Sequence, residues 1–191
     1  MMSFYILKSV VDDEDYLAEK VNVSEKGMHK LSISGVSLKD KELKIELKKN
    51  KGNVRNVISN LYGIPIISEL ISDVLLSNCP NEIELFEVKI DMKIESKFYF
   101  LNILDNVDAI DFEKSIYVEI MPETKVLSEI TKLVLNNSKV QSRHIFRLKH
   151  FRDEIVVSED LKNRLEDLKI SEYKFIPIED FEYKAGRLNR Y

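Results

Sequence analysis

Two stretches of the chain decide its fold, IPIISELISDVLLSNCPNEIELFEV at residues 64–88 and EIVVSEDLKNRLEDLKISEYKFIPI at residues 154–178. They can be aligned without a gap, so that Ser68 meets Ser158. In each stretch a β-favouring run leads through a serine into an amphipathic segment and then into a second β-favouring run. This pattern predicts two similar strand–helix–strand units. Only a few identities support the alignment, so the alternative that both stretches share a common βαβ pattern by coincidence stays open.

A serine stands at the start of both predicted helices, which are expected over residues 68–76 and 158–168. The hydroxyl groups of Ser68 and Ser158 can accept a backbone N–H group of the first helical turn. An acidic residue follows each serine, where negative charge complements the helix dipole. A further helix is expected over residues 124–135, because apolar residues recur there at helical spacing.

The rest of the chain indicates strands joined by polar connections. These strands are expected over residues 3–10, 31–36, 42–47, 83–90, 97–104, 115–120, 145–148, 154–157 and 173–178, with 31–36 and 42–47 forming an antiparallel pair. The predicted class is therefore α+β, with mostly antiparallel sheets and about three helices. We expect one domain over residues 1–180 and a peripheral tail over 181–191, in which Phe181 and Tyr183 could dock onto the domain.

The composition excludes most familiar catalytic chemistries. The 191 residues include five glycines, three histidines and one cysteine. The glycines are too far apart for a dinucleotide-binding or P-loop motif, and no metal-binding pattern of histidines and cysteines occurs. Cys79 follows a predicted helix, where the dipole raises the pKa of a thiol. We therefore predict no catalytic, cofactor-binding or metal-binding residues, and a protein that is not an enzyme.

The ends and the hydropathy of the chain favour a cytoplasmic protein. The first residues lack the positive leading region of a signal peptide and run directly into the acidic residues 12–15. No run approaches the ~18 apolar residues that a membrane span requires. The unpaired Cys79 fits a reducing compartment.

Charge is sorted along the chain, although the net charge is only −4. Residues 69–123 contain 13 acidic residues and four lysines, a net charge of −9, whereas residues 139–152 contain five basic residues and no acidic one. Such an asymmetry can steer a charged partner, and it is also typical of ordinary solvated faces. Within the acidic segment Asp105, Asp108 and Asp111 recur at every third position. They fit loop structure, a Ca²⁺ or Mg²⁺ site, or a partner contact.

Two other functions are compatible with these residues. A small enzyme or ligand-binding domain would assemble its site from scattered groups such as His144, His150, Arg147 and Asp153. A nucleic-acid regulator would use the basic segment 139–152, in which arginines alternate with aromatic residues. A pocket that brings the four scattered residues together would favour the first alternative.

Four segments resemble one known family: FYILKS at 4–9, NLYGIPIISELISDVLL at 60–76, FYFLNILDNVDAIDFEKS at 98–115, and HIFRLKHFRDEIVVSEDLKNRLEDLKISEYKFIPIE at 144–179. The chain is similar in these segments to the immunity-protein family of bacterial polymorphic toxin systems, formerly catalogued as a domain of unknown function. Residues 13–60 resemble it less, and residues 124–135 look like additional material.

This resemblance implies a cytoplasmic protein that binds and neutralises a cognate toxin domain. It implies no catalytic residues and no cofactor, and it assigns no toxin contacts. If the toxin is basic, the acidic segment is the natural docking face, so we take Asp105, Asp108, Asp111 and Glu113 as candidate partner-binding residues.

Overall fold

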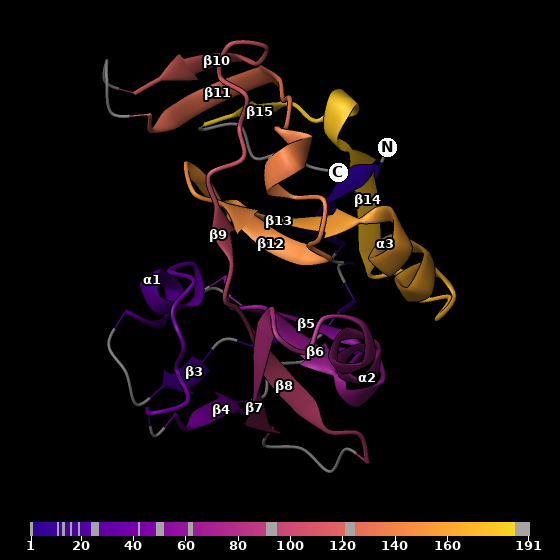
Figure 1. Cartoon of the computed structure of the whole chain (residues 1–191). Helices are drawn as coiled ribbons and strands as arrows, with labels where there is room; N and C mark the ends of the chain where they lie inside the picture. Colours follow the sequence, from indigo (N-terminus) through magenta and orange to yellow (C-terminus); the bar gives the residue numbers. More distant parts are fainter. Residues whose placement is uncertain are drawn as a thin grey trace.

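A computed structural model of the chain contains three β-sheets, which Figure 1 shows one above another. It describes residues 2–185 except for positions 11, 13, 16, 19, 24–26, 42, 49–51, 61–62, 91–94 and 121–124. Most neighbouring strands are antiparallel and three pairs are parallel. The prediction of an α+β protein with mostly antiparallel sheets is confirmed in these broad terms, with strands outweighing helices.

The N-terminal half, together with β8 from just past the midpoint of the chain, forms a seven-stranded sheet of order β2-β5-β6-β8-β7-β4-β3. Its strands are β2 (Leu17–Ala18), β3 (Lys20–Val23), β4 (Ile45–Lys48), β5 (Val57–Asn60), β6 (Ile66–Ser68), β7 (Ile83–Ile90) and β8 (Phe98–Ile103). Helix α1 (Met28–Ser32) lies between β3 and β4 in the chain, and α2 (Glu69–Asn78) links β6 to β7.

The other two sheets come mainly from the C-terminal half. The five-stranded sheet has the order β14-β1-β13-β12-β9, with β1 (Phe4–Ser9), β9 (Asn106–Val107), β12 (Ile145–Leu148), β13 (Phe151–Ser158) and β14 (Tyr173–Pro177). Helix α3 (Glu159–Glu166) links β13 to β14. The third sheet has the order β10-β11-β15, with β10 (Ile116–Glu119), β11 (Leu127–Lys132) and β15 (Tyr183–Lys184). Two 3₁₀ turns, η1 (Asn137–Lys139) and η2 (Ile178–Asp180), complete the described elements.

Two parts of the molecule share one topology. Strands β2, β5, β6, β8 and β7 have the same neighbours and relative directions as β9, β12, β13, β1 and β14. In both sets only the first pair is parallel. The residues 64–88 and 154–178 both form strand, helix and strand in the shared order. We call the first set with α2 the N-terminal unit, and the second set with α3 the C-terminal unit.

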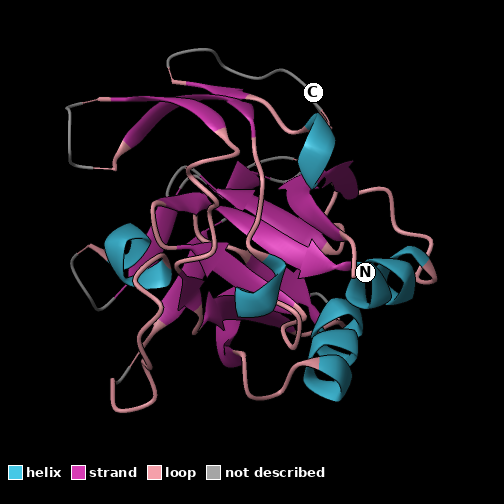
Figure 2. Ribbon diagram, turned by 45° about the horizontal axis from the view of Figure 1, so that its top comes forward, coloured by secondary structure: helices cyan, strands magenta, loops and turns pink. Residues whose placement is uncertain are grey.

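The fourth strand of each unit comes from the other half of the chain. Strand β1 starts the chain and lies between β13 and β14, whereas β8 lies between β6 and β7. Figures 1 and 2 show α2 and α3 side by side at one edge of the junction. A shared hydrophobic cluster joins the units there, including Ile71 and Leu75 of α2 and Leu161 and Leu165 of α3. Because the strands are exchanged, neither sheet is complete without both halves.

Matching carboxylates also connect the units. Glu82, which precedes β7, accepts the backbone N–H groups of His144 at 3.0 Å and Ile145 at 2.6 Å, where β12 begins. Glu172, which precedes β14, accepts the backbone N–H group of Asn56 at 2.8 Å, just before β5 begins. Each carboxylate therefore binds the strand start of the opposite unit, and the two glutamates meet in the alignment of residues 64–88 with 154–178.

The aligned serines also occupy matching places. Ser68 donates its hydroxyl to Asn56 Oδ1 at 3.0 Å, and the Ser158 hydroxyl lies 3.0 Å from His144 Nδ1. Ser158 also caps α3, because its Oγ accepts the backbone N–H group of Leu161 at 3.3 Å. The predicted cap of α3 is thus confirmed, whereas Ser68 occupies the N-cap position of α2 without a side-chain cap hydrogen bond, and that part of the prediction is wrong.

The predicted strand over residues 31–36 is wrong. Met28–Ser32 forms helix α1 and a turn follows it. Gly35 has a φ of +72°, which is outside the extended region, and a Cβ atom there would lie 2.8 Å from the side chain of Asn106. The predicted pairing of 31–36 with 42–47 is therefore wrong as well. Strand β4 instead pairs antiparallel with β3 and parallel with β7.

The predicted helix over residues 124–135 is wrong, because residues 127–132 form β11. Leu127 and Ile130 are both buried, although residues three apart point to opposite sides of a regular strand. A register shift against β10 lies between these two residues and reconciles this, since β11 includes Ser128 there as an extra residue. The bulge therefore produces a three-residue spacing of apolar residues, which in the sequence is indistinguishable from the spacing of a helix.

The remaining predicted elements match the structure closely. Strand β7 covers residues 83–90 as predicted, and the strand predicted over 154–157 begins earlier, at Phe151. In the predicted tail, Phe181 is 1% exposed and Tyr183 lies in β15, with its ring 4.6 Å from that of Phe151. Residues 186–191 lie outside the described residues.

Candidate functional site

The acidic candidates lie along the connection that runs from β8 through β9 to β10. Asp105 follows β8, Asp108 follows β9, and Asp111 and Glu113 lie in the turn before β10. Asp105 and Asp108 face the basic segment 139–152, because β9 pairs in parallel with β12. The sequence did not indicate this contact, because the strands β10 and β11 lie between the acidic connection and the basic segment in the chain.

Ion pairs join the two charged segments. Arg143 Nε lies 2.8 Å from Asp105 Oδ2. Asp108 has His150 Nε2 at 3.3 Å and Lys149 Nζ at 3.9 Å, and its side chain is 48% exposed. The two charge-rich segments thus neutralise each other in part. Their separate net charges overstate the field that a partner would meet.

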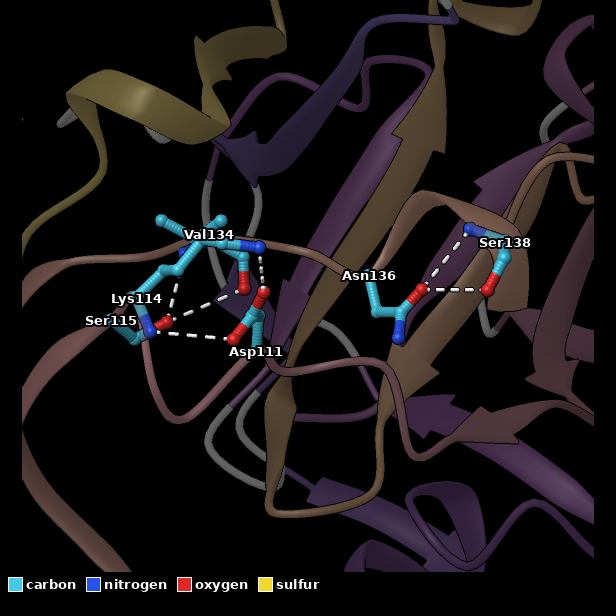
Figure 3. Close-up of polar contacts among 6 residues, drawn as sticks. All are labelled: Asp111, Lys114, Ser115, Val134, Asn136 and Ser138. Atoms are coloured by element: carbon cyan, nitrogen blue, oxygen red, sulfur yellow. Dashed lines mark hydrogen bonds and ion pairs between the residues drawn. The ribbon is translucent and has the colours of Figure 1, made fainter.

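Asp111 is held by its own turn, as Figure 3 shows. Lys114 Nζ lies 2.8 Å from Asp111 Oδ2, and this hydrogen bond holds the pKa of Asp111 below its usual range. Next to it, the Ser115 hydroxyl donates to the Val134 carbonyl at 3.3 Å and accepts its N–H group at 3.0 Å. These bonds fix the start of β10 against the segment after β11. Figure 3 also shows Asn136 Oδ1 accepting the Ser138 N–H and hydroxyl groups at the start of η1.

An exposed apolar surface continues directly from this turn. Ile116, Val118 and Ile120 are 60%, 52% and 59% exposed, and Val126, which follows on the way to β11, is 49% exposed. Strand β10 is also an edge strand of its sheet. We call these four residues the β10 face. The alternation of Ile116, Val118 and Ile120 is visible in the sequence, but which side of the strand faces outward is known only from the structure, where the intervening residues are half-buried.

The four scattered residues of the enzyme alternative do not meet in one pocket. Arg147 and Asp153 line a cavity of about 420 Å³, whereas His150 and Asp153 line a different one of about 450 Å³. His144 lines neither cavity and lies against Ser158. Burial lowers the pKa of His150, and Asp108 opposes that shift. This arrangement does not support a shared catalytic centre built from these groups.

Other chemistries have no assembled site among the residues that the structure describes. No group of three or more His, Cys, Asp or Glu side chains there could hold a metal ion. Burial raises the pKa of Cys79 to about 12, with Glu82 adding to the shift, and its thiol lies 3.1 Å from the Leu75 carbonyl. No helix in the described part of the chain is long and apolar enough to cross a membrane.

Large exposed apolar side chains on an edge strand are typical of proteins that act through a macromolecular partner. The chain belongs to the immunity protein family (Imm11), whose model matches residues 7–180. This match confirms the resemblance to an immunity family that the sequence segments indicated. No curated protein matches the chain.

Proposed function

We propose that this protein neutralises a cognate bacterial toxin domain in the cytoplasm by binding it, without catalysing a reaction. The observation that carries the proposal is the match of residues 7–180 to an immunity protein family. The mechanism is occlusion, in which the complex covers the surface that the toxin needs for its activity. Apolar side chains at the centre of the interface supply affinity, and charged residues around them supply orientation and association rate.

We place the toxin interface on the β10 face and the acidic turn before it. The apolar side chains of the β10 face are about half exposed, and burying exposed apolar area stabilises a complex by ~25 cal/mol per Å². Glu113 is exposed and makes no ion pair with a described residue, although its charge acts on the neighbouring Lys114. A basic group of the toxin can therefore approach it. Asp105, Asp108 and Asp111 contribute through the acidic charge of the same connection.

Co-expression with the toxin tests the function itself. A candidate toxin domain is expressed in bacteria with and without this chain, and survival is measured. Rescue by this chain, together with a purified one-to-one complex, is the expected result. Survival without a complex, or a complex without survival, would contradict neutralisation by binding.

Val118→Asp tests the β10 face. A carboxylate at the centre of a buried interface is left without a partner, and we expect the Kd to rise by ~10²-fold or more. Leu70→Asp is the matched control, because Leu70 on α2 is 47% exposed and Val118 is 52% exposed. Equal effects of the two substitutions on toxin affinity would exclude the β10 face, while the family-based function would stand.

Glu113→Lys tests the acidic turn. Because Glu113 holds no ion pair with a described residue, the substitution changes charge without breaking a contact of the fold. For a basic toxin we expect slower association at low salt and a smaller difference at high salt. An unchanged association rate at low salt would remove electrostatic steering from the proposal. Reversing Asp105 is less informative, since it also breaks the ion pair with Arg143.

A further inference from the structure

Arg147 is a buried cation at the junction of the two units. It lies on β12, where Phe146 and Leu148 belong to the hydrophobic cluster on one side of the sheet. Ile145 belongs to the cluster shared by both units. Because side chains alternate along a strand, Arg147 points to the same side as Ile145. Its exposed fraction is only 2%, so the sequence places a guanidinium group in the layer between the units.

The guanidinium is poorly satisfied within the described part of the chain. Its Nη1 donates to the Arg152 carbonyl at 2.7 Å, and its Nε is buried without a hydrogen-bond partner there. No described carboxylate lies within ion-pair distance of Arg147. Asp153 and Glu154 of β13 act on its charge from farther away, and Glu154 pairs with Lys8. A buried charge normally has a counter-charge and satisfied donors. The missing group is therefore an acceptor, and an anionic one matches best.

A cavity provides room for such a group. It has a volume of about 420 Å³ and is lined by both units, with Leu7 and Ser9 of β1, Ile58 and Ser59 of β5, Arg147 and Asp153 among its walls. This volume lies in the range of pockets for small organic molecules, ~300–1,000 Å³. Lys8 and Glu154 also line the cavity and pair with each other, so Arg147 is the cation of the lining that has a buried donor without an acceptor. Apolar walls around one such cationic donor are typical of sites for molecules that have an apolar body and one acidic group.

We propose that this cavity binds a small organic anion, whose carboxylate or phosphate group pairs with the Nε edge of Arg147 while its body lies between the two units. Arginine suits this role, because Nε and the neighbouring amino group can donate two parallel hydrogen bonds to two oxygen atoms of one acid group. Asp153, on the rim, opposes the ligand by charge repulsion. The site is separate from the β10 face and does not depend on toxin binding.

Calorimetric titration of the full chain tests the site with four probes. Benzoate and phenyl phosphate carry the two acid groups on an apolar body, inorganic phosphate lacks the body, and benzyl alcohol lacks the charge. We expect saturable one-to-one binding of benzoate or phenyl phosphate, and at least tenfold weaker binding of benzyl alcohol and inorganic phosphate. The stronger of the first two identifies the acid group. Absence of saturable binding for both overturns the proposal.

Variants assign the binding to the cavity. Arg147→Met retains the length of the side chain and should weaken the bound anion by at least tenfold, whereas Lys149→Met removes an exposed cation outside this cavity and should leave it unchanged. Asp153→Asn should strengthen binding several-fold, and Ser9→Phe should block the cavity from its exposed rim. The last two residues are exposed, so they keep the test valid even if Arg147→Met does not fold. Equal weakening by Arg147→Met and Lys149→Met, or no response to both Asp153→Asn and Ser9→Phe, overturns the proposal.

Discussion

The N-terminal and C-terminal units have the same sheet order, and they differ in what their chains insert after the first strand. In the N-terminal unit the insertion after β2 contains β3, α1 and β4, and its strands extend the sheet of their own unit. In the C-terminal unit the insertion after β9 contains β10 and β11, which form a separate sheet with β15. The first insertion lengthens a sheet, whereas the second presents the β10 face. The common part therefore acts as a framework, and the second insertion is where we place partner binding.

The units also differ at one matching position of their shared strands. Arg147 is the third residue of β12 and Ser59 is the third residue of β5, and both line the cavity between the units. A symmetric junction would carry the same residue type on both sides. Because Arg147 is charged and Ser59 is not, only the C-terminal unit contributes this cation to the cavity. One cation on one side suits the binding of a single anion.

The largest expected effect comes from the exchanged strands β1 and β8. Phe100 of β8 and Ile6 of β1 are both fully buried. Phe100→Ala should lower the free energy of unfolding by ~3–5 kcal/mol, and Ile6→Ala by ~2–5 kcal/mol, from lost burial and the cavities left behind. Because each strand completes the sheet of the other half, both units should lose stability together. Urea unfolding followed by circular dichroism measures the cost, and hydrogen exchange of each unit measures the coupling.

Hydrogen exchange also shows how this comparison could fail. If Phe100→Ala releases only the amides of the N-terminal unit and Ile6→Ala only those of the C-terminal unit, the strand exchange does not couple them. Leu70→Ala is the control, since Leu70 is 47% exposed and its truncation should change stability by no more than ~0.5 kcal/mol.

The next effect concerns the two carboxylates that connect the units. Glu82→Ala leaves the N–H groups of His144 and Ile145 without their acceptor, and Glu172→Ala leaves that of Asn56. Each loss should cost ~2–3 kcal/mol, because these N–H groups are at least partly buried and hydrogen bonds to a charged acceptor are stronger than neutral ones. Chemical denaturation of the two variants gives the comparison. A cost near zero for either one would show that its carboxylate is not needed to hold the opposite strand.

A smaller effect is expected where the insertion of the N-terminal unit attaches to its sheet, because the stability of this attachment should depend on pH. Glu84 of β7 is 4% exposed and accepts hydrogen bonds from Leu38 N at 2.8 Å and Asn102 Nδ2 at 3.1 Å, which attach the segment after α1 to the sheet. Burial raises the pKa of Glu84, but these bonds and one from Ser37 outweigh it and hold the pKa below its usual value. Ionised Glu84 therefore stabilises the fold above the ordinary glutamate pKa of ~4.3, and this stabilisation is lost as the pH falls through the lowered value.

Glu84→Gln tests this linkage. At pH 7 the variant should be less stable by ~1–3 kcal/mol, because its amide cannot accept all three hydrogen bonds. The difference from the unchanged protein should shrink as the pH falls below ~4. Urea titrations at a series of pH values measure it. A difference that stays constant with pH would contradict the role given to the charge. The residue of the C-terminal unit that matches Glu84 is Lys174, the second residue of β14, so this carboxylate is specific to the N-terminal unit.

Local patterns predicted the strand–helix–strand units, because Ser68, Ser158 and the amphipathic segments after them act within a few residues. The exchange of β1 and β8 could not be predicted in this way, since it depends on which distant strand completes each sheet. The helix predicted over 124–135 failed because a bulge in β11 places Leu127 and Ile130 on one side. Hydrophobic spacing alone does not distinguish a bulged strand from a helix.

The candidate site was predictable only in part. The charge run identified Asp105 and Asp108, but their pairing with Arg143, Lys149 and His150 depends on the parallel contact of β9 with β12. The burial of Arg147 likewise requires the packing of one unit on the other. In both cases the missing information is long-range, because an ion pair or a cavity belongs to two segments that the sequence does not place together.

The smallest effect should come from the aligned serines, and it separates two roles of one residue type. Ser158 caps α3 through the Leu161 N–H group, whereas Ser68 makes no such bond and donates to Asn56 instead. Removing an N-cap hydroxyl costs ~0.5–2 kcal/mol. Ser158→Ala should therefore destabilise the protein more than Ser68→Ala, and it should increase hydrogen exchange in the first turn of α3. If Ser68→Ala lowers the free energy of unfolding as much as Ser158→Ala and also increases hydrogen exchange in the first turn of α2, the two serines stabilise their helices equally. The difference in their hydrogen bonds would then have no effect on stability.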